Sequence, residues 1–486
     1  MVVKRHALVA LSLLAGASCS DVGGAIIPLP VGSGGTAPAG TGGATGGAGT
    51  ASTAGGSAGG GGEAGTGGEG GAGGSSGTAG GSGKMGTGGD DGGAADGGGG
   101  AADSGGGADA PFDDAFANDA SRPCDAGTGG MDWARALVDS TNKRFPNPAA
   151  APFDAWSYQP ALFLHGEYLV YKRTRDARYL QYVKAWVDSQ IDASGNIPDT
   201  LSWLDDIMPG NVLVDVYQEA PEPRYKTAIE RIRKRFDSFP RTSDGAFWHN
   251  TGATGQTWGD GVFMSCPFLA RYGQLFGDAA YANDETSRQL MLYHEHLKHP
   301  TNGTHYHAWD EQGDATWTTA AVKHSSESWC RAVGWYGMAM IEVLEVLPSN
   351  HVARPELVSI LQGLVEGFKR NQDPVTGRWF QVIDKGADSG NWLETSCSAM
   401  LAYTVSRAVQ RGYVAATYAE VVSKAYAGVM QKVTLGGDGL TNITDISVGT
   451  GVGNLAYYYG RGRATNDFHG LGAVLIMLEQ FRRSCP

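Results

Sequence analysis

Cysteine is scarce in this chain, which has six in 486 residues: Cys19, Cys124, Cys266, Cys330, Cys397 and Cys485. No pair has the short spacing of a zinc or iron–sulfur site, so no metal is expected. Cys124 and Cys485 flank the part of the chain that looks globular; an oxidising compartment would permit a disulfide between them, and the sequence leaves open whether it forms. The three cysteines that lie between them occupy apolar segments and are expected to pack as small hydrophobic side chains.

Basic side chains are too few for a nucleic-acid-binding protein. The chain has 37 Lys and Arg against 50 Asp and Glu, a formal net charge of −13. Residues 1–125 hold 12 of the acidic and 4 of the basic side chains, so the remainder is only mildly acidic. Neither part has the basic face of a nucleic-acid-binding domain.

The apolar run at residues 7–15 is too short to span a bilayer. It follows Lys4 and Arg5 and precedes small residues, which is the pattern of a secretory signal. The sequence "GASC", ending at Cys19, resembles a bacterial lipobox, in which the cysteine is acylated. We therefore expect an exported bacterial protein that contacts the membrane only through a lipid on Cys19, in the periplasm or at the cell surface. Simple secretion is the alternative.

Large apolar residues are rare in the next hundred positions, where Gly, Ala, Ser and Thr dominate. Such a segment cannot bury enough apolar area to offset its ordering entropy. An acidic stretch near Asp113 lacks the spacing of a calcium-binding loop and is interpreted as the end of this linker. The expected domains are a lipoprotein-type signal at 1–19, a disordered linker at 20–127 and a catalytic domain at 128–486.

Strand-like alternation is scarce in that last domain, although residues 245–250 and 377–384 could form short loop strands. Apolar periodicity instead predicts twelve helices beginning near Asp132, Gln159, Arg178, Asp205, Arg224, Gly261, Ala279, Glu327, Pro355, Trp392, Tyr413 and Asn466. Three segments with a tyrosine at each end, starting at Tyr171, Tyr217 and Tyr272, recur after 46 and 55 residues. Such a period indicates stacked helical hairpins, either a closed toroid of six hairpins or an open solenoid.

The repeat gives two aspartates the same position. Asp205 and Asp260 each lie twelve residues before the tyrosine that opens a repeated segment. In a toroid, equivalent helix starts face one central mouth, which Tyr158 would share. Capping of a helix explains each aspartate singly. The aromatic residues around the two helix starts favour a functional cleft instead.

Several motifs, taken together and in order, identify a family. They are "WSYQPALFLHGEYLVY", "LDDIMPGNVLVDVY", "WGDGVFM", "THYHAWDEQGD", "SWCRAVGWYGMAM" and "NDFHGLGAVLI". This set resembles the unsaturated rhamnogalacturonyl hydrolases of glycoside hydrolase family 105, with the unsaturated glucuronyl hydrolases of family 88 as near relatives. The resemblance implies an all-α (α/α)6 barrel. It also implies an enzyme without cofactor or obligate protein partner that acts on oligosaccharides released by a polysaccharide lyase.

In that family, C4 of a terminal 4-deoxy-4,5-unsaturated uronic acid is protonated and water adds to C5. The resemblance assigns the proton donor and base to Asp260 and the second carboxylate to Asp205, with Asp206 a weaker candidate. It also places His307, Trp329 and Arg331 in the active site. Of these, Trp329 and Arg331 would bind substrate. Three more would line the sugar pocket: Tyr158, Met264 and Trp335. Asn250 stands where some members have a lysine that contacts the sugar beyond the uronate.

Elementary chemistry supports these roles and leaves alternatives. A carboxyl group that protonates carbon must keep its proton, which burial of Asp260 or the like charge of Asp205 would promote. Arg331 offers a planar fork for the uronate carboxylate, or else forms a structural ion pair with Asp310. His307 binds a sugar hydroxyl, orients Asp260 or is a packing residue.

Trp329 and Trp335 lie six residues apart and do not share a helix face. Trp329 is therefore expected to stack on sugar, whereas Trp335 could be core. Three functions remain open: hydrolysis of pectic rhamnogalacturonan fragments, the same chemistry on glycosaminoglycan fragments, and sugar binding by an inactive lipoprotein. Retention of four residues together disfavours the inactive binder: Asp205, Asp260, His307 and Arg331.

Overall fold

The computed structural model describes residues 130–483. The expected signal segment with its lipidation site Cys19, the expected linker at 20–127, and both Cys124 and Cys485 lie outside the described residues. Their predicted roles therefore stay predictions.

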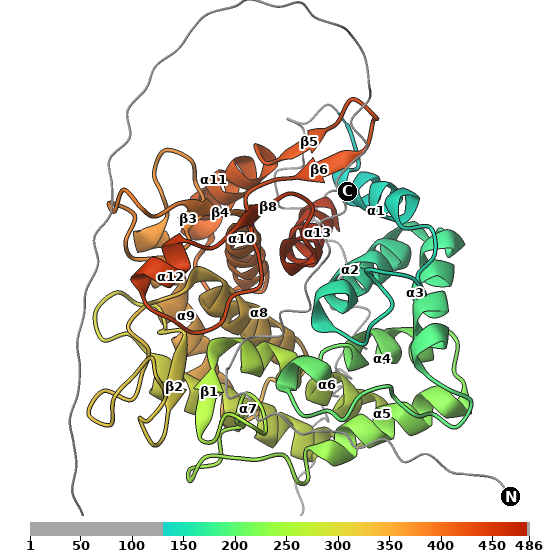
Figure 1. Ribbon diagram of the computed structural model, residues 1–486, viewed down its shortest axis with the longest axis horizontal. Coiled ribbons are helices and arrows are strands. Elements are labelled where there is room, and N and C mark those ends of the chain that lie inside the picture. The colour runs from blue at the N-terminus through green and yellow to red at the C-terminus, as the bar shows by residue number, and fades with distance from the viewer. Residues whose placement is uncertain (1–129, 484–486) are drawn as a thin grey trace, which may run out of the picture. The chain divides into compact units, whose positions relative to one another are not determined.

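Six inner helices form a closed ring around the centre of the described domain (Figure 1). They are α2 (Tyr158–Thr174), α4 (Gly210–Glu219), α6 (Gly259–Phe276), α8 (Cys330–Val346), α10 (Thr395–Gln410) and α13 (Phe468–Arg483). Each packs against the next, and α13 packs against α2. This closure makes the domain an (α/α)6 barrel rather than an open solenoid.

Six outer helices surround the inner ring (Figure 1). They are α1 (Trp133–Arg144), α3 (Ala177–Gln190), α5 (Pro223–Arg235), α7 (Ala279–Leu297), α9 (Arg354–Asn371) and α11 (Ala419–Met430). An outer helix buries one stripe, as α3 does with Tyr179, Val183 and Trp186. An inner helix is buried on every side, as α8 is from Cys330 to Leu344. The burial pattern thus follows the two layers.

Ring closure depends on a close approach of α13 to α2. A Cβ atom added to Gly472 of α13 would lie 2.7 Å from the backbone of Leu162 and Phe163 in α2. Real Cβ atoms do not approach backbone so closely, so only glycine fits at this position. Gly472, the second glycine of "GLG" in the C-terminal motif, therefore allows the ring of helices to close.

A buried polar network ties five consecutive inner helices together. The Arg271 guanidinium on α6 lies 3.3 Å from Asp215 on α4 and 2.9 Å from Glu342 on α8. Asp215 also lies 2.6 Å from His165 Nδ1 on α2, and the Tyr403 hydroxyl on α10 donates to Glu342 over 2.9 Å. Buried charges are tolerated when paired in this way.

The predicted helix starts agree with the structure except in two places. The helix expected from Asp205 begins as the 3₁₀ turn η2 (Leu204–Asp206) and continues as α4, and the helix expected from Tyr413 begins as η3 (Ala416–Tyr418) before α11. The short helix α12 (Leu455–Tyr459) was missed, because five residues carry no helical periodicity.

Four antiparallel strand pairs lie in the loops: β1 (Gln256–Trp258) with β2 (Ala308–Asp310), β3 (Trp379–Phe380) with β4 (Leu393–Glu394), β5 (Val433–Leu435) with β6 (Thr441–Ile443), and β7 (Ile446–Ser447) with β8 (Arg463–Ala464). The strand expected in residues 377–384 is β3. The one expected in residues 245–250 is wrong, because Phe247 and Asn250 make only isolated bridges.

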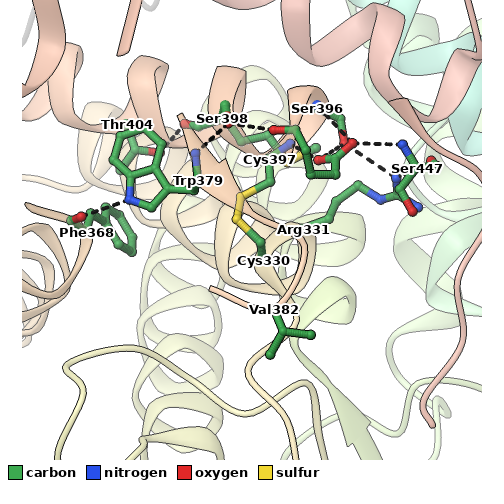
Figure 2. The surroundings of a disulfide bond; sticks show 12 residues. Cys330, Arg331, Phe368, Trp379, Val382, Ser396, Cys397, Ser398, Thr404 and Ser447 are labelled. Atoms are coloured by element: carbon green, nitrogen blue, oxygen red, sulfur yellow. Dashed lines mark hydrogen bonds between the residues drawn. A yellow bond between two sulfur atoms is a disulfide. The ribbon is translucent and has the colours of Figure 1, made fainter. Parts of the chain in front are cut away.

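The cysteine prediction requires a correction. Cys330 and Cys397, expected to pack as free thiols, form a disulfide with Cα atoms 5.7 Å apart (Figure 2). They lie in the first turns of the neighbouring helices α8 and α10, a proximity that no local pattern reveals. Cys266 is free and buried, as expected.

Candidate active site

The N-terminal ends of the inner helices gather the predicted site residues. Inner helices alternate with outer helices that run back, so all six inner helices point the same way. Asp260 lies in the first turn of α6 and Arg331 in the first turn of α8. Tyr158 opens α2, and its ring lies 5.9 Å from that of His469 in the first turn of α13. The partial positive ends of these helices favour negative charge at this mouth.

The β1–β2 pair brings His307 to Asp260. Trp258 pairs with Ala308, and the next amide, that of Gly259, donates to the His307 carbonyl over 2.8 Å. This register places His307 Nε2 3.2 Å from Asp260 Oδ2. The two atoms are close but not aligned for a hydrogen bond, since each lacks such a partner among the described residues.

Asp260 does not cap its helix. Trp258 is the capping residue of α6, and its side chain makes no capping hydrogen bond. The glycine that follows Asp260 has a packing role, because a Cβ on Gly261 would lie 2.8 Å from Leu204 and 2.9 Å from the Tyr293 hydroxyl. The capping interpretation of "GDG" is therefore wrong, and the carboxylate is left for another use.

The expected protonation of Asp260 is also wrong for the free protein. Although burial raises the pKa of Asp260, the nearby His307, His249 and Arg331 together lower it below its ordinary value. The pKa of Asp205 is instead raised well above normal, by burial and then by the charges of Asp260 and Asp206. The structure thus shifts the pKa values of the two carboxyl groups in opposite directions, with Asp205 the one that holds its proton more tightly.

Asp205 and Asp206 have different surroundings within η2. The Asp206 carboxylate accepts the Trp203 amide over 2.8 Å and closes the 3₁₀ turn. Asp205 Oδ1 is buried without a hydrogen-bond partner among the described residues. This contrast agrees with the prediction that Asp205 is the better candidate for the site.

Arg331 is buried, about 1% exposed, and points to the loop after β7 (Figure 2). Its guanidinium donates to the carbonyls of Ser447 over 2.6 Å and Val448 over 2.9 Å, and lies over the Trp329 ring. Within residues 130–483 it makes no ion pair. The alternative partner Asp310 instead accepts amides of its own loop. A buried cation without a counterion is costly unless an anion binds there.

The other predicted substrate-binding residues have different surroundings, some at the mouth and some in the core. Trp329 packs against His307, with ring centroids 4.5 Å apart, and its Nε1 has no hydrogen-bond partner among the described residues. Trp335 and Met264 are each about 1% exposed and belong to the main core, where Trp335 stacks on Phe263. Tyr158 is half-buried and meets Trp335 edge to face.

Sequence reasoning missed three residues at this mouth. His249 stacks on Trp258 at 4.3 Å, and neither of its ring nitrogens has a partner among the described residues. Burial lowers the pKa of His249 to about 4, so its ring is neutral. His469 lies within the recognised C-terminal motif, which could have revealed it. Tyr458, whose hydroxyl lies 2.7 Å from His307 Nδ1, sits in α12 and gave no signal.

A cleft of about 560 Å³ lies beside these residues. It is lined by Thr316, Trp317, Thr318, Thr319, Val322, His324, Ser326, Val452, Gly453, Asn454 and Tyr457. The lining combines aromatic rings with hydroxyl and amide groups and contains no Lys, Arg, Asp or Glu. Gly453 connects it to the candidate site residues, because its amide donates to the Tyr458 hydroxyl over 3.2 Å.

Comparison with known families decides the affiliation. The family model described as Glycosyl Hydrolase Family 88 matches residues 133–484. The chain belongs to this family. This result confirms the predicted affiliation with families 88 and 105 and the prediction of a glycoside hydrolase.

Individual family 88 and 105 proteins are also similar to this chain. The unsaturated rhamnogalacturonyl hydrolase YesR of Bacillus subtilis strain 168 is 26% identical over 305 residues, 61% of this chain and 81% of that protein. A family 105 glycoside hydrolase from C. acetobutylicum ATCC 824 is 31% identical with a TM-score of 0.69, covering 72% of this chain and 99% of its own. An unsaturated glucuronyl hydrolase from Bacillus sp. GL1 shares the fold, with a TM-score of 0.56 and 14% identity. The match covers 71% of this chain and 94% of that protein, which is described as responsible for glycosaminoglycan degradation.

Residues 130–483 contain neither a metal-binding cluster nor a membrane-spanning helix. No group of three or more His, Cys, Asp or Glu side chains in this part could hold a metal ion. None of its helices combines the length and apolarity that crossing a membrane requires.

Proposed function

We propose that this family 88 member removes the terminal 4-deoxy-4,5-unsaturated uronic acid from pectic rhamnogalacturonan fragments that a lyase has cut. The observation that carries the proposal is Arg331, a buried cation without an ion-pair partner in the described part of the chain and close to Asp260. The carboxylate of a uronic acid would supply the missing charge in a bidentate pair. The similarity to YesR supports the same substrate class.

The proposed reaction adds water across the C4=C5 double bond. A proton from Asp260 bonds to C4, the oxygen of a water bonds to C5, and the proton that this water loses returns to the Asp260 carboxylate. The C5 hemiketal then opens to a ketone as the bond between C5 and the ring oxygen breaks. The hemiacetal left at C1 releases the neighbouring sugar.

Substrate binding would place the proton on Asp260. The uronate brings a like charge, engages Arg331 and excludes water, and each of these raises the pKa of Asp260. Asp205 retains its own proton and can donate it in a hydrogen bond to the uronate. His249, neutral and without a protein partner in the described part, and Trp329 Nε1 would meet sugar hydroxyls or the attacking water. Tyr158 would contact the sugar ring at the edge of the site.

The uncharged cleft favours a neutral leaving sugar. Trp317 and Tyr457 offer rings for stacking, and the threonines offer hydroxyl groups. A sulfated glycosaminoglycan unit would need cations in this lining, and it has neither Lys nor Arg. We therefore propose a rhamnogalacturonan fragment over a glycosaminoglycan fragment.

One assay separates the three functional hypotheses. Lyase-treated pectin and lyase-treated chondroitin are offered to the purified protein, and loss of the ultraviolet absorbance of the double bond is followed. We expect loss on the pectic fragments, and at least about 100-fold slower loss with Asp260→Asn. Faster loss on chondroitin would overturn the substrate assignment. No loss on either would leave the sugar-binding lipoprotein.

We further propose export, with a lipid anchor on Cys19. The Cys330–Cys397 disulfide supports an oxidising compartment, because cytosolic proteins rarely keep such bonds. Radiolabelled lipid should enter the wild-type chain and not Cys19→Ala. Absence of label from the wild type would leave secretion without an anchor.

A further inference from the structure

Tyr458 reaches the proposed catalytic residues from the short helix α12. Its side chain is fully buried, and its hydroxyl oxygen lies 2.7 Å from His307 Nδ1. The other ring nitrogen of His307, Nε2, lies 3.2 Å from Asp260 Oδ2. The three side chains therefore form a line from α12 through the loop before β2 to α6.

The hydrogen-bond donors along this line determine where the protons lie. The Gly453 amide donates to the Tyr458 oxygen over 3.2 Å, so that oxygen already accepts one hydrogen bond. If His307 Nδ1 also donated to it, the hydroxyl proton of Tyr458 would be buried without an acceptor among the described residues, which is costly. The arrangement that satisfies every group has the Tyr458 hydroxyl donating to Nδ1.

This choice fixes the tautomer of the neutral His307 ring. With Nδ1 accepting, the ring proton is on Nε2, the nitrogen next to the Asp260 carboxylate. The opposite tautomer would turn a lone pair toward that carboxylate and repel it. Burial raises the pKa of the Tyr458 phenol well above normal, so the phenol keeps the proton that it donates.

We propose that Tyr458 is a positioning residue that holds His307 in the tautomer with its proton on Nε2, the nitrogen that lies 3.2 Å from Asp260 Oδ2. The inference rests on the proposed function, in which Asp260 exchanges a proton with substrate. An Nε2 proton would stabilise the Asp260 carboxylate after it has protonated C4 and would steer the proton coming back from water. Tyr458 thereby acts through His307 and need not touch the sugar.

The test uses Tyr458→Phe, which removes the hydroxyl and keeps the ring that packs against Trp329 and His307. Its matched control is Tyr459→Phe, the next residue of α12, whose hydroxyl donates to Asp388 over 2.8 Å away from His307. Nitrogen-15 NMR of the His307 ring is recorded at a pH where the ring is neutral. The wild type and the control should show the Nε2–H tautomer, and Tyr458→Phe a mixture of tautomers.

Kinetics supply the second readout. Tyr458→Phe should lower kcat about ten- to a hundredfold while KM stays within about twofold. The reason is that a mixture of His307 tautomers affects proton transfer rather than substrate binding. The control should keep both values. An unchanged His307 tautomer in Tyr458→Phe, or an unchanged kcat, would overturn the inference. If the wild type proved inactive on unsaturated uronides, the proposed function would fail, and the NMR result would still decide whether Tyr458 sets the tautomer.

Discussion

Asp205 and Asp260 are the same kind of side chain with opposite pKa shifts, and the difference comes from their neighbours. His307, His249 and Arg331 favour the ionised form of Asp260. Burial and two neighbouring negative charges disfavour the ionised form of Asp205. Pairs of carboxyl groups with separated pKa values are typical of acid–base sites. The pair therefore holds two carboxyl groups whose pKa values lie on opposite sides of the ordinary one.

The raised pKa of Asp205 predicts that removing its charge stabilises the protein at neutral pH. In the unfolded chain Asp205 ionises near its ordinary value of 3.8, and in the folded chain only at higher pH. Between these values the folded state holds the extra proton, so the free energy of unfolding falls as pH rises. Asp205→Asn should therefore have a higher Tm than the wild type at pH 7, by a margin that shrinks toward pH 4, while activity falls.

The control for this experiment is Asp192, an exposed carboxylate whose pKa is lowered by bonds from Asn196. The ionised Asp192 carboxylate stabilises the folded state above the ordinary pKa, and this contribution is lost as pH falls. Asp192→Asn should therefore lower Tm at pH 7. An Asp205→Asn margin that is the same at pH 4 and pH 7 would contradict the assignment of a raised pKa.

Arg331→Lys should separate substrate binding from structure. The charge remains but the planar fork is lost, and because hydrogen bonds to charged groups are worth about 1.5–3 kcal/mol, kcat/KM should fall about ten- to a hundredfold through KM. Tm should fall too, since Arg331 also holds two backbone carbonyls. Arg407→Lys, at a buried pair with Glu345, should lower Tm and leave KM unchanged. A lower Tm with unchanged KM for Arg331→Lys would exclude the uronate role.

The sequence could predict which residues meet, but not how they are charged. Asp205 and Asp260 share a register along the repeat, and His307 and Arg331 lie in recognisable motifs. The order of the two pKa values depends on three cationic or polar groups from different elements. Tyr458 contacts a residue 151 positions away and lies outside any periodic pattern. Such contacts exist only after the barrel has closed.

At the scale of elements, the long helices could be predicted from sequence because each must bury an apolar face. α12 and most of the short loop strands could not, since they are held by neighbours rather than by their own pattern, and β3 is the exception. Those short elements nevertheless complete the site. β1 and β2 set the register of His307, and the loop after β7 holds Arg331. The disulfide joins α8 and α10 at the same end (Figure 2).

The disulfide should stabilise the domain. It closes a sequence separation of 67 residues, and a cross-link of that span typically contributes about 2–4 kcal/mol by restricting the unfolded chain. The double variant Cys330→Ser/Cys397→Ser should lose about that much in urea unfolding. Reductant should weaken the wild type and leave the double variant unchanged. Equal unfolding curves for the two proteins would show that the bond does not form.

At the scale of the whole molecule, the closed ring explains why distant segments of the chain share one mouth. α13 packs on α2, and α1 packs on both, so the first and last described helices depend on each other. The family match likewise begins at residue 133, the first residue of α1. We therefore expect the domain to need α1 and not to need the residues well before it.

Shortened chains test this boundary. A chain that begins at Ala120 should keep the Tm and kcat/KM of the full-length protein, because it contains every described helix. A chain that begins at Asn147 lacks α1 and exposes the faces of α2 and α13 that α1 covers. It should lose several degrees of Tm or fail to fold. Loss of activity in the Ala120 chain would show that the boundary is wrong.

The central claim is hydration of a double bond, not ordinary attack on the anomeric carbon. The most direct measurement is NMR of the product that the wild-type enzyme forms from an unsaturated pectic disaccharide in D₂O. Protonation of C4 by an exchangeable carboxyl group predicts one deuterium at C4 of the released keto acid and loss of the double bond. Release of the sugar with the C4=C5 double bond intact, or a C4 without deuterium, would contradict the account.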